Sequence, residues 1–323
     1  MRPHRPRRRP PAPSASTADI VAASPAPGLA AVICTHARPG YLAACLAGLD
    51  AQQGARCDVI VVDSASPAAD AAQIARLAAR AGARLVRADR PGLSHARNLG
   101  LAASGADWTA FLDDDAVPAP DWAARLAEAI ATLPADAAAL GGRILPHWEG
   151  PLPGWWPPAL RGVLTIVEWE GRGEEGRDLP PGVAVYGANM AFRSATLRAI
   201  GGFPEELGRI GQRLLSGEEV EVLDRLRARS CRVFYDGRMV VRHSIQRERL
   251  RPAWLLSRLH WQGATDALRD RRRGRAHRAP RAAAKLLVQA PLLLVPPRAT
   301  SLLRARCGAA YNLGYLRGAL QTG

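Results

Sequence analysis

The sequence predicts an α/β fold in which a doubly wound, mostly parallel sheet is flanked by helices. Two observations predict this class. From residue 29 to residue 112, short apolar runs alternate with longer segments of helical periodicity. Helices of this length between strands form right-handed crossovers, which connect parallel strands. The chain of 323 residues, 48% of them hydrophobic, is long enough to bury such a core.

The individual elements follow from the same alternation. The segments LAAVICT, CDVIVVD, ARLVRAD and WTAFL are short and mostly apolar, as buried strands are. Pro118 and Pro120 follow the last of them and interrupt regular structure. The expected strands are residues 29–35, 57–63, 83–89 and 108–112, and the expected helices between them are residues 40–52, 70–82 and 94–104.

The positive charge of the chain gathers near its two ends. The formal net charge is +15, and the excess lies mainly in residues 2–9 and 242–281. Such a distribution favours an anionic partner, which can be a phosphate group, acidic lipid or nucleic acid. Residues 1–28 contain no continuous apolar run, so we expect a disordered basic leader and not a signal peptide.

The cysteines argue for a reducing compartment. The five cysteines are scattered and show no C-x-x-C spacing, which speaks against a disulfide framework or a zinc site. We therefore expect a cytoplasmic protein. No segment reaches the 18 or so uninterrupted apolar residues of a membrane span.

The C-terminal part, residues 246–323, is expected to be a basic, partly apolar helical extension. Residues 250–270 have the pattern of a helix. Residues 282–297 are apolar but interrupted by Lys285, Gln289 and Pro291. Two interpretations of this stretch remain, a helix packed on the body of the protein and a peripheral contact with the inner face of the cytoplasmic membrane.

Polar side chains follow three of the predicted strands. Asp113, Asp114 and Asp115 come directly after WTAFL, and Asp63 ends CDVIVVD. Open α/β sheets bind ligands at the carboxyl ends of their strands. Adjacent carboxylates repel one another unless a cation lies between them, and Mg²⁺ or Mn²⁺ would suit these oxygens. A solvated acidic loop, and for Asp63 a helix cap, are the plain alternatives.

Two familiar nucleotide motifs are missing. The chain has no G-x-G-x-x-G after its first strand and no G-x-x-x-x-G-K-[ST]. The sequence therefore excludes the usual hydride-transfer and P-loop sheets. In the absence of these motifs, guanidinium groups such as those of Arg38 and Arg97 are suited to bind a diphosphate.

Seven segments together resemble the family 2 glycosyltransferases of the GT-A fold. They occur in the same order as in that family: VICTHARP, VIVVDSASP, GLSHARNLGL, FLDDDAVP, YGANMAFRSATLRAIGGFPEELG, LLSGEEVEVLDRLR and VVRHS. The resemblance implies a GT-A catalytic domain over residues 29–245. Its nucleotide-binding half would be about 29–118 and its acceptor half about 119–245.

The resemblance also implies roles for individual residues. Asp115 would coordinate Mg²⁺ or Mn²⁺, and His243, which follows a late strand, would complete the metal site. A structural histidine is the alternative for His243. The residues implied in binding the nucleotide-sugar donor are Thr35, Arg38, Asp63, Arg97, Asp113 and Asp114.

The acceptor half carries the implied catalytic base. Glu219 corresponds to the second residue of an acidic pair, where most relatives have Asp, and Glu218 is the alternate. Both are equally compatible with an ordinary acidic first turn of a helix. Trp155 and Trp156 are expected to contact the acceptor or anchor a lid, and Asn189 to hydrogen-bond the sugar.

The function implied is inverting, metal-dependent transfer of a sugar from a nucleotide-diphosphate donor to a glycan or lipid-linked acceptor, in surface or capsular glycan or a related bacterial-type polymer. A sugar nucleotidyltransferase is one alternative, although its Gly- and Arg-rich loop is missing after the first strand. The other is a non-catalytic basic protein that binds nucleic acid or a membrane surface. Nucleic acid is not expected as a partner, because the positive charge lies mainly in the tails.

Overall fold

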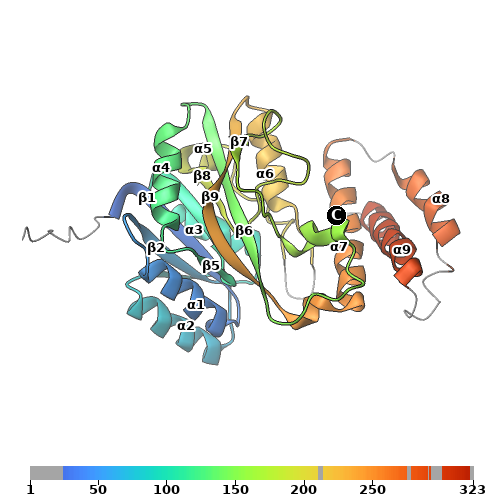
Figure 1. Ribbon diagram of the computed structural model, residues 1–323, viewed down its shortest axis with the longest axis horizontal. Coiled ribbons are helices and arrows are strands. Elements are labelled where there is room, and N and C mark those ends of the chain that lie inside the picture. The colour runs from blue at the N-terminus through green and yellow to red at the C-terminus, as the bar shows by residue number, and fades with distance from the viewer. Residues whose placement is uncertain (1–24, 210–213, 275–277, 290, 292–299, 321–323) are drawn as a thin grey trace, which may run out of the picture.

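The protein is an α/β body with a helical extension at one end (Figure 1). The fold is taken from a computed structural model that describes residues 25–209, 214–274, 278–289, 291 and 300–320. Most of the predicted leader lies outside these residues. The first strand begins at Pro25, four residues before the start that the apolar pattern indicates.

The first half of the body consists of strands and helices in strict alternation. The predicted strands and helices are all present, with ends shifted by a few residues. They are β1 (Pro25–Thr35), α1 (Pro39–Asp50), β2 (Arg56–Asp63), α2 (Ala68–Arg80), β3 (Arg84–Arg87), α3 (Leu93–Ala103) and β4 (Trp108–Asp113).

The second half is less regular. Its elements are β5 (Ala116–Pro118), α4 (Trp122–Thr132), β6 (Ala137–Trp148), the 3₁₀-helix η1 (Pro158–Leu164), β7 (Arg172–Glu174), β8 (Met190–Arg193), α5 (Ser194–Ala199), α6 (Glu218–Arg227), β9 (Arg232–Ile245) and the 3₁₀-helix η2 (Arg247–Leu250). The extension contains α7 (Pro252–Arg272), α8 (Ala279–Gln289) and α9 (Thr300–Leu320).

One sheet runs through the body. In the described residues it has nine strands in the order β3-β2-β1-β4-β8-β6-β9-β5, with β7 paired to β9. The strands β3, β2, β1 and β4 are all parallel, as predicted. Beyond β4 the pairing is mixed, because β8 is antiparallel to both β4 and β6.

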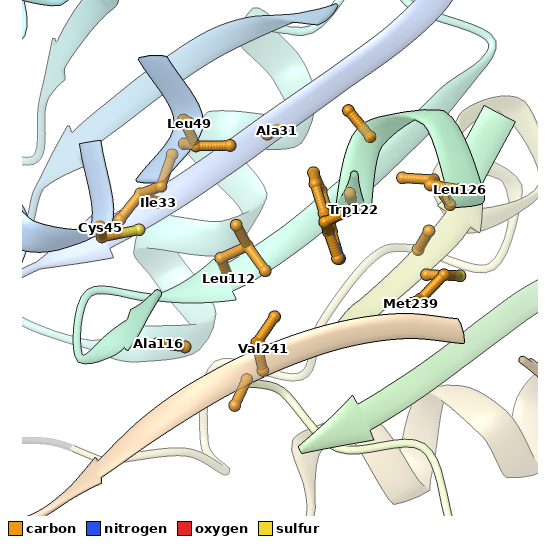
Figure 2. Close-up of a cluster of buried hydrophobic side chains, with 14 of the residues drawn as sticks. Ala31, Ile33, Cys45, Leu49, Leu112, Ala116, Trp122, Leu126, Met239 and Val241 are labelled. Atoms are coloured by element: carbon orange, nitrogen blue, oxygen red, sulfur yellow. The ribbon is translucent and has the colours of Figure 1, made fainter. Parts of the chain in front are cut away.

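The core lies on both faces of this sheet. Successive residues of a strand face opposite sides, so Ala31 and Ile33 pack under α1, α2 and α4 while Val32 packs under α3, α5 and α6. Figure 2 shows the first cluster, in which Trp122 of α4 is fully buried. Burial on both faces explains why these strands read as continuous apolar runs.

The register brings the predicted polar residues to one edge of the sheet. Thr35 at the end of β1 is paired with Asp63 at the end of β2, and Cys34 with Asp113 at the end of β4. After the turn at Asp114, the short strand β5 pairs with β9. This pairing places His243 opposite Ala116 and therefore beside the aspartates.

The extension packs on the body through a cluster of its own. Trp156 and Leu164 of the irregular segment contact Leu255 and Leu259 of α7, and Leu303 of α9 joins them. Among the described residues, no helix has the length and hydropathy to cross a bilayer. Of the apolar stretch 282–297, residues 282–289 belong to α8 and most of the rest lies outside the described residues.

Candidate active site

A cavity of about 300 Å³ opens at the carboxyl ends of β1 and β4. It is lined by both halves of the body and by α7. Eight of the residues predicted for the site line it: Thr35, Arg38, Arg97, Asp113, Asp114, Asp115, Glu218 and Glu219. The sheet edge predicted to bind a ligand therefore opens into a cavity that is lined by both acidic and basic side chains.

Asp114 holds Arg38 in place. Thr35 Oγ1 donates a hydrogen bond of 2.8 Å to Asp114 Oδ2, and Arg38 Nε donates one of 3.1 Å to the same oxygen. A second guanidinium nitrogen of Arg38 pairs with Asp114 Oδ1. Both carboxylate oxygens are thus engaged within the protein, and Asp114 is placed to orient Arg38.

Asp113 and Arg97 form a second ion pair. Arg97 is buried and donates to Asp113 Oδ1 at 3.1 Å and to Glu218 Oε1 at 2.7 Å. Burial alone would lower the pKa of Arg97, but the two carboxylates outweigh it and raise the pKa above its usual value. The Asp113 side chain remains 30% exposed, so it is the aspartate that faces the cavity most openly.

Asp115 lies among cationic and amide donors. Its Oδ2 accepts hydrogen bonds from Arg38 and Arg249, both at 3.1 Å, and from Gln246 at 3.0 Å. Its Oδ1 lies 3.4 Å from His243 Nε2. Burial would raise the pKa of this carboxyl, but His243 and the two guanidinium groups lower it well below its ordinary value. Asp115 is therefore ionised at neutral pH.

The residues predicted to hold a metal are adjacent, but they do not form a complete shell. Asp115 Oδ1 and His243 Nε2 offer two ligands, and the described residues contain no group of three or more His, Cys, Asp or Glu suited to a metal. Mg²⁺ is often held by one or two carboxylates together with substrate phosphates and water. The pair fits a metal whose other ligands come from a substrate. Arg249 is a neighbouring cation, since its guanidinium lies 3.3 Å from the same His243 nitrogen.

The two candidate bases have different surroundings. Glu218 Oε1 accepts a hydrogen bond of 2.7 Å from Arg97, whereas Glu219 has no ion pair in the described residues. The Oε2 atoms of both glutamates are enclosed and lack a hydrogen-bond partner in that part of the chain. Burial, together with the neighbouring charge of Glu218, raises the pKa of Glu219 to about 7. Both begin α6, which follows Gly217 in the left-handed conformation (φ 86°). A carboxylate with this pKa is suited to accept a proton near neutral pH, so its pKa makes Glu219 the better candidate for the base.

Asp63 does not line the cavity. Its buried carboxylate accepts a hydrogen bond of 2.9 Å from the backbone N–H of Ser66 and pairs with Arg87 of β3. The neighbouring Ser64 lines the cavity. Asp63 therefore organises the turn after β2, which is close to the capping role that was its alternative.

Asn189 lies in the core of the body and does not line the cavity. Its side chain is fully buried, accepts a hydrogen bond of 2.9 Å from Trp122 Nε1, and donates to the carbonyls of Arg143 and Met239. All of these partners belong to the core of the body. A buried amide must satisfy its hydrogen bonds, and here it does so without a ligand.

The two tryptophans lie away from the cavity. Trp155 and Trp156 stack on one another with ring centroids 5.4 Å apart, and Trp156 is buried in the cluster under α7. Neither lines the cavity. Their position suits the anchoring of the irregular segment, which was one of their two expected roles.

Sequence reasoning missed several polar residues in or beside the cavity. Arg249 and Gln246 follow His243 closely, in HSIQRER, and could have been found from that proximity. Tyr186 of the YGANM segment also lines the cavity. Its pKa is raised mainly by burial and, to a smaller extent, by the negative charge of Glu219. Arg258 belongs to α7, and nothing in the helical pattern distinguishes it from the other arginines of that helix.

The half-parallel, half-mixed sheet and the aspartates at its edge fit the GT-A fold that the motifs predict. The comparison with protein families agrees. Residues 30–155, less than half of the chain, match the model "Glycosyl transferase family 2". The resemblance drawn from the motifs is confirmed.

Two curated relatives are similar over a little more than half of the chain. One is the glucosyl-dolichyl phosphate glucuronosyltransferase of Haloferax volcanii, 29% identical over 55% of this chain and 56% of its own length. The other is the pre-mycofactocin glycosyltransferase of Mycobacterium tuberculosis, 30% identical over 55% of this chain and 35% of its own. The match thus spans about half of one relative and about a third of the other.

Two solved structures have a similar fold. The mannosyltransferase PcManGT from Pyrobaculum calidifontis, in complex with GDP-Man and Mn²⁺, superposes with a TM-score of 0.57 at 20% identity and covers 90% of this chain and 89% of its own. TarS from S. aureus, in complex with UDP, gives a TM-score of 0.52 at 14% identity and covers 88% and 89%. Identities this low show the fold alone, and they confirm the GT-A prediction.

Proposed function

We propose that the protein is an inverting, metal-dependent glycosyltransferase that moves a sugar from a nucleoside-diphosphate donor to a hydroxyl acceptor. One observation carries the proposal. A single cavity holds a carboxylate poised near neutral pH, Glu219, and a cationic cluster with aspartates suited to a diphosphate.

The donor diphosphate binds at the aspartate turn. Arg38 and Arg249 lie there, both paired with Asp115, and guanidinium groups bind phosphate oxygens bidentately. Asp115 and His243 would hold Mg²⁺ or Mn²⁺. When bound, the metal acts as a Lewis acid that neutralises charge on the departing diphosphate. The ligands GDP-Man and UDP of the two similar structures support a nucleotide donor and leave its base open.

The acceptor is activated from the opposite side by Glu219. An acceptor hydroxyl has a high pKa and must lose its proton as it attacks the anomeric carbon. Glu219 Oε2 accepts that proton, and attack opposite to the leaving diphosphate inverts the anomeric centre. Arg97 holds Glu218 in place, and burial together with the neighbouring charge of Glu218 raises the pKa of Glu219.

The acceptor is a glycan or a lipid-linked compound. The haloarchaeal relative is named for a dolichyl-phosphate-linked substrate, which supports the lipid-linked class. The exposed side chains of α8 support peripheral contact with an anionic bilayer. Leu287 and Val288 are 80% and 78% exposed, and Arg281 and Lys285 of the same helix are exposed as well.

The test of the proposed function is the release of nucleoside diphosphate from a panel of nucleotide sugars. Glu219→Gln should lower turnover by roughly 10² to 10⁴-fold while the affinity for the donor changes little. Glu221→Gln is the matched control, because Glu221 lies on the same helix and pairs with Arg225 outside the cavity. Equal turnover in wild type and Glu219→Gln would refute the assignment of the base.

A further inference from the structure

Arg258 of α7 brings into the cavity a cation to which the proposed function assigns no role. One of its terminal nitrogens, Nη2, donates a hydrogen bond of 3.0 Å to Ser216 Oγ. The other, Nη1, is enclosed and has no hydrogen-bond partner in the described residues. No ion pair of Arg258 is found in that part of the chain. Both Arg258 and Ser216 line the cavity.

This arrangement differs from that of the two buried guanidinium groups at the site. Arg97 is paired with Glu218 and Asp113, and Arg249 with Asp115. Arg258 is half-buried and has no ion pair in the described residues. Burial, and then the charge of Arg209, lower its pKa to about 10, although nearby carboxylates act in the opposite direction. A half-buried charge with an enclosed, unpartnered nitrogen costs free energy, which favours a role other than stability.

Arg258 lies near Glu219 in the cavity. The carboxylates that raise its pKa are Glu219, Glu218 and, more weakly, Asp266 outside the cavity. Asp115 is held instead by Arg38 and Arg249. Arg258 makes no ion pair with Glu219 in the described residues. The guanidinium and the carboxylate are therefore both free to act on a substrate, the first on an anion and the second on a hydroxyl.

We propose that Arg258 and Ser216 bind a carboxylate or phosphate group that is carried by the transferred sugar or by the acceptor, and that Arg258 thereby selects acidic substrates. This inference rests on the proposed function and adds the chemical class of one substrate to it. Guanidinium groups bind both anions by paired hydrogen bonds, so the shared chemistry is an oxyanion beside Glu219. The donor diphosphate is a different group, bound at the aspartate turn.

Calorimetry on the full chain separates the two sources of the anion. The donor arm compares UDP-glucuronate with UDP-glucose and GDP-mannuronate with GDP-mannose, which differ only in one carboxylate. The acceptor arm compares citronellyl phosphate with citronellol in the presence of UDP or GDP. In wild type, the acidic member of one arm should bind on the order of 10- to 100-fold more tightly, the range of a charged hydrogen bond.

Three variants test the residue. Arg258→Gln should abolish the acidic preference, and Arg258→Lys should keep part of it. Arg251→Gln is the matched control, since Arg251 is exposed at the start of the same helix. The melting temperature of Arg258→Gln should stay the same or rise, because the substitution removes a half-buried charge that has no ion pair in the described residues. A role in the packing of α7 would lower it.

Several results would overturn the inference. They are an equal affinity for acidic and neutral members in both arms, a preference that survives Arg258→Gln, and a loss of affinity for UDP or GDP as large as that for the acidic substrate. If Arg258→Gln does not fold, an unchanged preference in both Arg258→Lys and Ser216→Ala overturns it.

A protein that binds neutral nucleotide sugars without any acidic preference contradicts this inference alone. A protein that binds no nucleotide or nucleotide sugar contradicts the proposed function and the inference with it.

Discussion

Two neighbouring glutamates show how local contacts divide chemical roles. Glu218 and Glu219 are adjacent in the first turn of α6, but only Glu218 meets Arg97. The pairing holds Glu218 in place and leaves Glu219 next to it in an enclosed position. Burial and the neighbouring charge of Glu218 raise the pKa of Glu219 to about 7.

The pH dependence of activity and stability follows from this difference. Below pH 7, turnover of the wild type should fall about tenfold per pH unit as Glu219 becomes protonated. Between its ordinary value of 4.5 and about 7, Glu219 is protonated in the folded chain and ionised in the unfolded chain. The folded state binds more protons, so this contribution to stability is lost as the pH rises through that window.

Urea unfolding of wild type and Glu219→Gln from pH 5 to pH 8 measures the effect. The difference in unfolding free energy between the two should change in favour of the variant as the pH rises. Parallel curves for the two proteins would show that Glu219 has an ordinary pKa.

The sequence predicted most of the charged residues of the cavity, for a physical reason. Polar side chains at the ends of parallel strands meet at one edge of a sheet, and Thr35, Asp113 and their neighbours do so here. The burial of Asn189 was not predicted because a motif does not reveal whether a polar group has partners in the core. Arg258 was missed because its role depends on where α7 packs.

At the scale of elements, α7 is positioned by its contact with α9. The two helices approach so closely that a Cβ atom on Gly263 or Gly314 would meet backbone atoms of the facing helix. Glycine allows this approach because it has no side chain. The helical periodicity of apolar residues predicted a helix at residues 250–270, but this periodicity did not show which helix would pack against it.

Gly314→Ala should therefore disturb the pair. The added methyl group would meet the carbonyl oxygen of His260, and overpacking of this kind costs about 1–3 kcal/mol. Leu313→Ala, at a neighbouring exposed position, is the control and should change the unfolding free energy by less than about 0.5 kcal/mol. Chemical denaturation gives both values, and a Gly314→Ala variant as stable as Leu313→Ala would contradict the packing of α7 on α9.

The strands of the first half were easier to predict than those of the second. β1, β2 and β4 are buried on both faces, and their continuous apolar runs are separated by amphipathic helices. In the second half, β6 pairs with β8 and β9, which lie far along the chain, and β6 contains glycine and proline. Long-range pairing of this kind leaves little trace in local periodicity.

At the scale of the whole molecule, the extension joins the cavity to a candidate membrane surface. α7 supplies Arg258 to the site, while α8 exposes apolar and basic side chains at the far end of the molecule (Figure 1). An acceptor with a lipid anchor would require both features. The charge excess of the C-terminal part is consistent with attraction to an anionic bilayer.

Cosedimentation with vesicles tests this surface. The full chain should bind vesicles of phosphatidylglycerol and phosphatidylcholine more tightly than vesicles of phosphatidylcholine alone, and less so at high salt. Replacing Leu287 and Val288 by Glu should weaken binding at least about tenfold, since both apolar burial and charge attraction are lost. Leu152→Glu, at an exposed position of the body, serves as the control. Equal binding by the double variant and the control would rule out α8 as the contact.

The proposed function requires the cavity to bind a nucleotide sugar with the help of a metal. The most direct measurement is calorimetric titration of the full chain with UDP- and GDP-sugars, with and without Mn²⁺, on wild type and Asp115→Asn. We expect one donor to bind the wild type, with Mn²⁺ strengthening binding at least tenfold, and Asp115→Asn to lose that gain while still unfolding cooperatively. If no nucleotide sugar binds the wild type under either condition, while anionic vesicles or polyanions do, the protein is a basic surface-binding protein and not a glycosyltransferase.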